Sequence, residues 1–324
     1  MQKAIILLVI LFCFLVMNLN AQQEYQVSQF MYDHISVNPG ASGSQDMASV
    51  NGIIRRQWTG IEGAPQNIII HATAPFRMLK KDHGFGITFV NDKLGINQDN
   101  ILGLSYAYRA DVGDGKLGIG AGLHINFRQF DNTSWYLPTG NDFTPADQDF
   151  SIPKSLEQAN AFDLSFGLFY KTENVYFGLS ATHINQNSYK FVNENTTGDS
   201  ELHNKIYRHY YITSGYTMQL ANPSFELTPS FLIQSDGKIH KIDINTILTY
   251  NKKFWGGVSF RPGGALIGMI GFEILNGAKI GFAYDFPVTA ITNYYDTSYE
   301  VLLNYSFKIG VDKTPQKYKS IRFL

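Results

Sequence analysis

The sequence predicts an all-β fold, a transmembrane outer-membrane β-barrel of about 14 antiparallel strands with a short N-terminal periplasmic or plug segment and a short C-terminal tail. Three observations predict it. Only 16% of the 324 residues are charged, while 14% are aromatic and 29 are glycine, so the chain is poorer in charge than ordinary soluble domains. Large apolar residues alternate with small or polar ones, as in strands. The connections between these segments fall into two alternating sets along the chain. One set consists of tight turns, and the other contains all of the longest connections.

The charge balance and the apolar content exclude several classes of protein. With 26 lysine and arginine residues against 27 acidic ones, the formal net charge of -1 offers no basic surface for nucleic acid. A hydrophobic fraction of 44% excludes a disordered chain. A helical membrane protein with several spans is excluded because the chain has one long apolar run.

Residues 1–21 are predicted to be a secretory signal peptide. Lys3 precedes an apolar run from Ala4 to Met17, and Ala21 is the small residue expected just before a cleavage site. The single cysteine, Cys13, lies in this run. The exported chain would therefore have no cysteine, which excludes disulfides, thiolate metal sites and cysteine catalysis.

Residues 22–47 are polar and irregular, and the chain changes character at Ala48. We expect this stretch to be an N-terminal periplasmic or plug segment. Its turn, Asn38-Pro39-Gly40, combines a side chain that bonds locally, a fixed φ and a flexible glycine. This turn would end the segment where it enters or caps the periplasmic mouth.

Residues 48–309 are predicted to form the barrel wall. In the clearest example, residues 117–128, apolar side chains alternate with glycine or polar ones, so one face would be apolar and the other small or polar. Fourteen segments show this pattern: 48–58, 67–75, 84–91, 100–110, 116–131, 161–172, 175–185, 206–220, 225–236, 238–250, 254–261, 265–275, 278–286 and 298–309.

The connections favour a barrel over a soluble β-sandwich, whose strands would also alternate. Even-numbered connections are tight, as at Glu173-Asn174 and Asn276-Gly277. The longest connections, residues 132–160, 186–205 and 287–297, are all odd-numbered. Short periplasmic turns and longer external loops are typical of outer-membrane barrels. Residues 310–324 would then be a periplasmic C-terminal tail, whose basic residues could meet an acidic partner.

The sequence contains no motif for catalysis, for a cofactor or for a metal. It has no glycine-rich phosphate loop, nucleophile elbow or zinc-binding His-Glu-x-x-His motif, and its eight histidines are scattered singly. We therefore expect a non-enzymatic protein with no cofactor, no metal ligand and no small-molecule substrate. Two weaker alternatives stay open: calcium on the acidic patch Asp142, Asp147 and Asp149, and a phospholipase- or protease-type triad of His183, Ser188 and Asp199.

Charged residues occupy the polar phase of many strands, and both signs are mixed. A pore selective for one type of ion would favour a ring of one sign, whereas a mixed lumen suits cross-barrel salt bridges or a packed plug. The pattern therefore favours a closed barrel. These residues are Arg109, Arg128, Asp163, Glu226, Lys241, Asp243, Glu273, Lys279, Asp285, Glu300 and Lys308.

Motifs within residues 26–110 resemble the start of the PorP/SprF family of outer-membrane proteins, which are associated with type IX secretion and gliding. These motifs are Gln29-Phe30-Met31-Tyr32, the run from Ser36 to Gly43, the run from Arg55 to Ile61, Gly63-Ala64-Pro65, Gly84-Phe85-Gly86-Ile87, the run from Asn91 to Gly95, and Tyr106-Ala107-Tyr108-Arg109. The family-motif residues singled out, with no role assigned, are Asn38, Pro39, Gln57, Trp58, Pro65, Asp92 and Gly95.

The resemblance implies a non-enzymatic barrel of the type IX secretion and gliding system, integral to the outer membrane and in contact with its lipid. Such a barrel would bind or anchor a secreted, adhesin-like surface protein by its C-terminal domain, or would link to the secretion core. Its partners would be that surface protein and type IX secretion components. The alternative is an outer-membrane transport barrel for hydrophobic or small solutes, which would need an apolar pocket reachable from outside.

Overall fold

The computed structural model describes residues 24–130, 157–191, 202–288 and 297–308. The predicted signal peptide (1–21) and tail (310–324) lie outside these ranges, as do Asp142, Asp147, Asp149 and Asp199. The barrel strands are β1 (Ala48–Arg56), β2 (Gln66–Met78), β3 (Lys81–Leu94), β4 (Asn97–Val112), β5 (Gly115–Phe130), β6 (Glu157–Lys171), β7 (Val175–Thr182), β10 (His209–Tyr216), β11 (Met218–Gln219), β12 (Phe225–Ser235), β13 (His240–Tyr250), β14 (Phe254–Arg261), β15 (Ala265–Leu275), β16 (Ala278–Pro287) and β17 (Ser298–Phe307).

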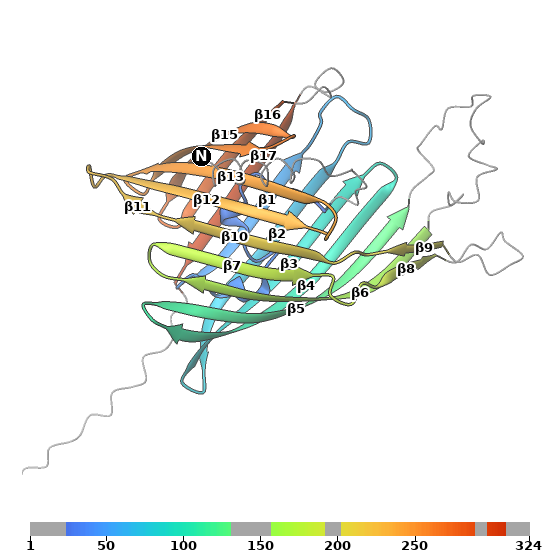
Figure 1. The fold of residues 1–324 in the computed structure, drawn as a ribbon, viewed down its shortest axis with the longest axis horizontal. Coiled ribbons are helices and arrows are strands. Elements are labelled where there is room, and N and C mark those ends of the chain that lie inside the picture. Colours follow the sequence, from blue (N-terminus) through green and yellow to red (C-terminus); the bar gives the residue numbers. More distant parts are fainter. Residues whose placement is uncertain (1–23, 131–156, 192–201, 289–296, 309–324) are drawn as a thin grey trace, which may run out of the picture.

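The strands close into one antiparallel ring (Figure 1). Each pairs with its neighbour along the chain, β10 pairs with β12, and β1 pairs with β17 from Ala48↔Phe307 to Arg56↔Tyr299. The sheet has 15 strands by hydrogen bonding, but β10 and β11 are two parts of one interrupted strand, which gives 14 strands around the ring. The predicted fold class is confirmed.

Side-chain alternation explains why this sheet closes around a lumen. On β5, Gly118, Gly120 and Gly122 are buried on the inner face, while Ile119, Leu123 and Ile125 are exposed on the outer face. The outer surface is thus apolar, as contact with lipid requires. No helix in the described part of the chain is long and apolar enough to cross a bilayer.

The two ends of the barrel differ in their connections. At one end, here called the turn end, neighbouring strands are joined by two to five residues, such as 79–80, 113–114 and 276–277. The opposite end, called the loop end, carries the connections 57–65, 131–156, 183–208 and 288–297. The sequence predicts this arrangement, with tight turns at one end of the barrel and the longest connections at the other.

Two segments differ from the prediction. The predicted strand 206–220 is interrupted at Thr217, where the ladder passes Thr228 and Pro229 of β12, because proline has no N–H to donate. The predicted long connection 186–205 contains a hairpin, β8 (Ser188–Phe191) paired with β9 (Leu202–Lys205), which extends beyond the barrel rim (Figure 1).

Candidate functional site

Residues 24–47, here called the N-terminal segment, contact the inner face of the barrel on opposite sides of the ring. The segment contains two short 3-10 helices, η1 (Phe30–Tyr32) and η2 (Pro39–Ala41), and lies inside the ring of strands in Figure 1. The main-chain N–H of Gln29 donates to Glu300 on β17, whereas Asn38 donates to the main chain of β6 and β7. In the ring order β17 lies opposite β7, so the segment crosses the lumen.

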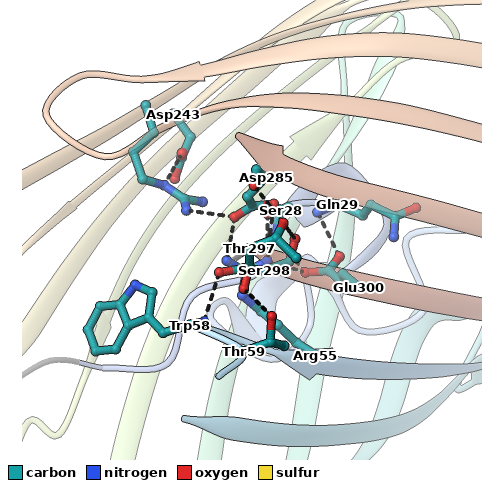
Figure 2. A network of polar contacts seen from close by, with 11 residues as sticks. Ser28, Gln29, Arg55, Trp58, Thr59, Asp243, Asp285, Thr297, Ser298 and Glu300 are labelled. Carbon is teal, nitrogen blue, oxygen red and sulfur yellow. Dashed lines mark hydrogen bonds and ion pairs between the residues drawn. The ribbon is translucent and has the colours of Figure 1, made fainter. Parts of the chain in front are cut away.

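A buried charge network ties the start of this segment to the wall (Figure 2). The Arg55 guanidinium lies 2.6 Å from Asp285 and 3.4 Å from Glu300, and all three side chains are at most 5% exposed. The main-chain N–H groups of Ser28 and Gln29 donate to the two Glu300 oxygens over 2.7 and 2.9 Å. The Ser28 hydroxyl lies 2.8 Å from Arg55 and donates to Asp285 over 3.0 Å.

The geometry of this network makes it a strong structural constraint. Buried charges are costly unless they are paired and hydrogen-bonded. Here Arg55 faces both carboxylates, and Arg261, which pairs with Asp243 over 2.6 Å, also lies 3.7 Å from Asp285. The second negative charge is stabilised by hydrogen bonds from the main chain of Ser28 and Gln29, because charge-assisted bonds of this kind are strong. The network therefore needs both the wall and the N-terminal segment.

Further contacts continue along the segment. Asp33 lies 3.1 Å from His71 on β2, and Asn51 on β1 donates to the Tyr32 carbonyl over 2.9 Å. The His34 ring lies between Phe169 and Tyr176, with centroids 5.1 and 4.6 Å away. Burial, together with the charge of Lys171, lowers the pKa of His34 to about 4, so this ring is neutral at physiological pH.

Glycines on the wall make room for the end of the segment. A Cβ on Gly120 would lie 2.5 Å from the Gly40 nitrogen, and one on Gly118 or Gly167 would meet Gly40 or Asn38. The Asn38 amide donates to the Leu168 and Leu179 carbonyls over 3.0 and 3.3 Å, and its oxygen accepts from the Gly40 N–H over 2.9 Å. These glycines allow the main chain of the segment to reach the main chain of the wall.

The family-motif residues fall into separate groups rather than one site. Asn38 and Pro39 are buried against the wall glycines, where Asn38 caps η2. At the loop end, the Gln57 N–H donates to the Pro65 carbonyl over 3.0 Å and the Trp58 N–H donates to the Ser298 hydroxyl over 3.0 Å.

The other two motif residues also lie towards the loop end, on the β2–β3–β4 side. The Gly95 N–H donates to the Gly63 carbonyl over 2.8 Å, so it connects two loop-end connections. Asp92 accepts from the Asn67 amide over 2.6 Å and lines the loop-end cavity. These contacts are structural, and they do not bring the seven motif residues together.

A cavity of about 280 Å³, here called the loop-end cavity, lies between the N-terminal segment and the loop end of the wall. Its lining combines polar and apolar surface, and the charged or titratable residues in it include Glu24, Asp92, Asp99, Arg128, His183 and His209. Arg128 pairs with Asp99 on the neighbouring strand, its Nε donating over 2.6 Å. The predicted triad does not assemble in the described residues, because the charged contacts of His183 are to Asp163 and Glu24 rather than to Ser188.

Sequence reasoning missed several residues of these sites. Asp285 and Glu300 were expected in the lumen, but Arg55 was not singled out, although its alternation with the exposed Arg56 indicates an inward side chain. Glu24 and Asp33 lie in a segment without periodicity, so no pattern predicted their partners.

The comparison with protein families agrees with the motifs and with the barrel geometry. A model of the type IX secretion system membrane protein PorP/SprF matches residues 19–305. The chain belongs to the PorP/SprF family. Its predicted family and its predicted place in the outer membrane are thereby confirmed. A comparison with curated proteins finds no match.

Solved structures similar to this PorP/SprF barrel are themselves barrels with little sequence identity. The toluene transporter TbuX of Ralstonia pickettii is 12% identical, with a TM-score of 0.47 over 87% of this chain and 94% of that one. The outer membrane protein Omp33 of Acinetobacter baumannii is 8% identical, with a TM-score of 0.44 over 82% and 100%. At these values neither similarity is evidence of function.

Proposed function

We propose that this PorP/SprF barrel is a closed, non-enzymatic docking component of the type IX secretion and gliding system. It binds or anchors a secreted surface protein by that protein's C-terminal domain, or links to the secretion core. The observation that carries the proposal is the N-terminal segment, which acts as a plug because it is tied to β17 on one side of the lumen and to β6 and β7 on the other.

The space left beside the plug is small. Two further cavities along the described part of the segment measure about 30 Å³ each. That is space for only a few water molecules, not for a solute path. A barrel with such a lumen supports recognition at its ends rather than diffusion through its centre.

The transport alternative fits these features less well. A hydrophobic solute needs an apolar pocket reachable from outside, but in the loop-end cavity the apolar surface is interrupted by charged groups such as Asp92, Asp99 and Arg128. Enzymatic activity would need a base and a nucleophile within hydrogen-bond reach, and His183 instead contacts two carboxylates.

The β8–β9 hairpin at the loop end is the described surface that best fits a protein partner. Its root is fixed because Tyr189, 2% exposed, packs on Ala159 and Ala161. The Arg128 guanidinium lies 4.3 Å from the centre of the Tyr189 ring. A hairpin with a rigid root presents its residues to a partner with little loss of conformational entropy. We place this end outside the cell, since long loops of outer-membrane barrels are external.

Replacing residues 186–205 by a short glycine-serine linker is expected to abolish partner binding while leaving the barrel folded. Tyr189→Ala, which removes the packing at the hairpin root, is expected to weaken binding by about 1–3 kcal/mol. Co-purification from native outer membranes measures both effects. His240→Ala, an exposed change elsewhere on the loop end, is the control. Undiminished partner retention by the linker variant would remove the hairpin from the docking surface.

A further inference from the structure

Three titratable side chains from distant parts of the chain meet at the loop-end cavity, and a fourth contacts one of them from behind. Glu24 and His183, which lie 159 residues apart in the sequence, have Oε2 and Nε2 3.2 Å from each other. His209 Nδ1 lies 3.7 Å from the same Glu24 oxygen. One ligand atom from each of these three residues can be chosen so that all lie within 4.8 Å of one another. Asp163 contacts His183 from its other side, 2.7 Å from Nδ1.

The His183 ring contacts a second carboxylate on the side away from Glu24, as the ring of a metal-binding histidine commonly does. Its Nδ1 faces the Asp163 carboxylate while its Nε2 faces Glu24. In metal sites a carboxylate behind a histidine typically fixes the ring and leaves the other nitrogen free to bind the ion. The backbone of His183 has a φ of +54°, a conformation that L residues rarely adopt, and its side chain is buried. Such a conformation persists only where the surroundings fix it.

The same three residues line the loop-end cavity, so an ion can reach them without crossing the plug. Lys241 also acts electrostatically on Glu24, which makes one local positive charge besides the imidazoles. The carboxylates of Glu24 and Asp163 are the negative charges that contact His183. A divalent ion bound between His183 and Glu24, whose Nε2 and Oε2 atoms lie 3.2 Å apart, would compensate these negative charges.

We propose that Glu24, His183 and His209 bind a divalent transition-metal cation of the zinc type, with Asp163 positioning His183. Two imidazoles and one carboxylate are a donor set that zinc prefers, and the cavity leaves room for water as the remaining ligand. The bound ion links Glu24 of the plug to His183 and His209 of the wall. It thereby stabilises the plug at the loop end, independently of the partner that the barrel carries.

The probe for this site is Zn²⁺ alone, titrated calorimetrically into the full-length barrel purified in detergent and stripped with a chelator. We expect one saturable equivalent in the unaltered protein and in His240→Ala. Glu24→Gln and His183→Ala are expected to weaken binding at least tenfold, and Asp163→Asn by about 10- to 100-fold. Equal binding by Glu24→Gln and the unaltered barrel, or no saturable binding at all, overturns the proposal.

A second readout separates loss of a ligand from loss of the fold. Co²⁺ in place of Zn²⁺ is expected to give visible absorption bands of a site with nitrogen and oxygen ligands in the unaltered barrel, and not in Glu24→Gln. Glu24 lies outside the strands, so this variant keeps every wall residue. The shift in electrophoretic mobility between heated and unheated samples shows that each variant is folded. Identical Co²⁺ spectra for folded Glu24→Gln and the unaltered barrel contradict the site.

Discussion

Arg55→Met is expected to lower the free energy of unfolding of the barrel by about 3–5 kcal/mol. The substitution keeps most of the side-chain volume but removes the cation from Asp285 and Glu300, which are almost completely buried. Among the described residues, Glu300 would then have no cation beside it and would keep only the N–H groups of Ser28 and Gln29, while Asp285 would keep the more distant Arg261 at 3.7 Å. The denaturant midpoint, followed by electrophoretic mobility without heating, measures the loss.

A matched control for Arg55 is Arg77→Met. Arg77 also pairs with an aspartate, Asp82, at 3.2 Å, but its side chain is 70% exposed. Surface pairs contribute at most about 1 kcal/mol, so this variant should unfold close to the unaltered barrel. Combining Arg55→Met with Asp285→Asn and Glu300→Gln should recover part of the loss, because it removes the unpaired charges. Equal stability of the two single variants would contradict the assigned role of the network.

Gly120→Leu is expected to push the plug out of the lumen and to convert the closed barrel into a conducting one. A Cβ at this position would lie 2.5 Å from the main chain of the plug at Gly40, and main chain cannot rotate aside as a side chain can. Planar-bilayer recording should show resolved conductance steps for this variant and none for the unaltered protein. Ala121→Leu adds similar bulk on the lipid-facing side of the same strand and should stay closed.

A cysteine pair reports on the same displacement without a bilayer. The hydroxyl oxygens of Ser42 in the plug and Ser105 in β4 lie 2.8 Å apart, so cysteines at these positions should form a disulfide. The chain has one other cysteine, Cys13, in the predicted signal peptide. We expect the cross-link in the otherwise unaltered barrel and its loss after Gly120→Leu. A closed Gly120→Leu barrel that retains the cross-link would show that the plug tolerates the added side chain.

The fold could be predicted from the sequence because the alternation of side chains that marks each strand is a local pattern. On β5, alternation alone places Gly120 inside and Ile119 outside, and every barrel strand follows from the same two-residue period. The sequence also shows Pro229, and its missing N–H could have indicated the interruption between β10 and β11. The mixed charges of the lumen do form ion pairs in the structure, such as Arg128 with Asp99 and Arg261 with Asp243, while a lumen closed to solutes stays a prediction.

The sites could be predicted only in part, because their contacts are not local. The plug has no periodicity, and Ser28 meets Glu300 across 272 residues of chain. Two of the histidines that looked scattered, His183 and His209, are brought together by the antiparallel pairing of β7 with β10, which places Thr182 opposite His209. Family-motif residues such as Trp58 and Gly95 form main-chain hydrogen bonds in the loop-end turns, contacts that a motif alone does not reveal.

Purification of the native chain from its own outer membrane in mild detergent tests the docking proposal most directly. Mass spectrometry of the purified material identifies what remains bound, and bilayer recording of the same sample measures conductance. We expect a secreted surface protein or type IX secretion components in near-equal amount, and a barrel that does not conduct. A barrel that is purified alone and conducts small solutes would contradict it and would favour transport.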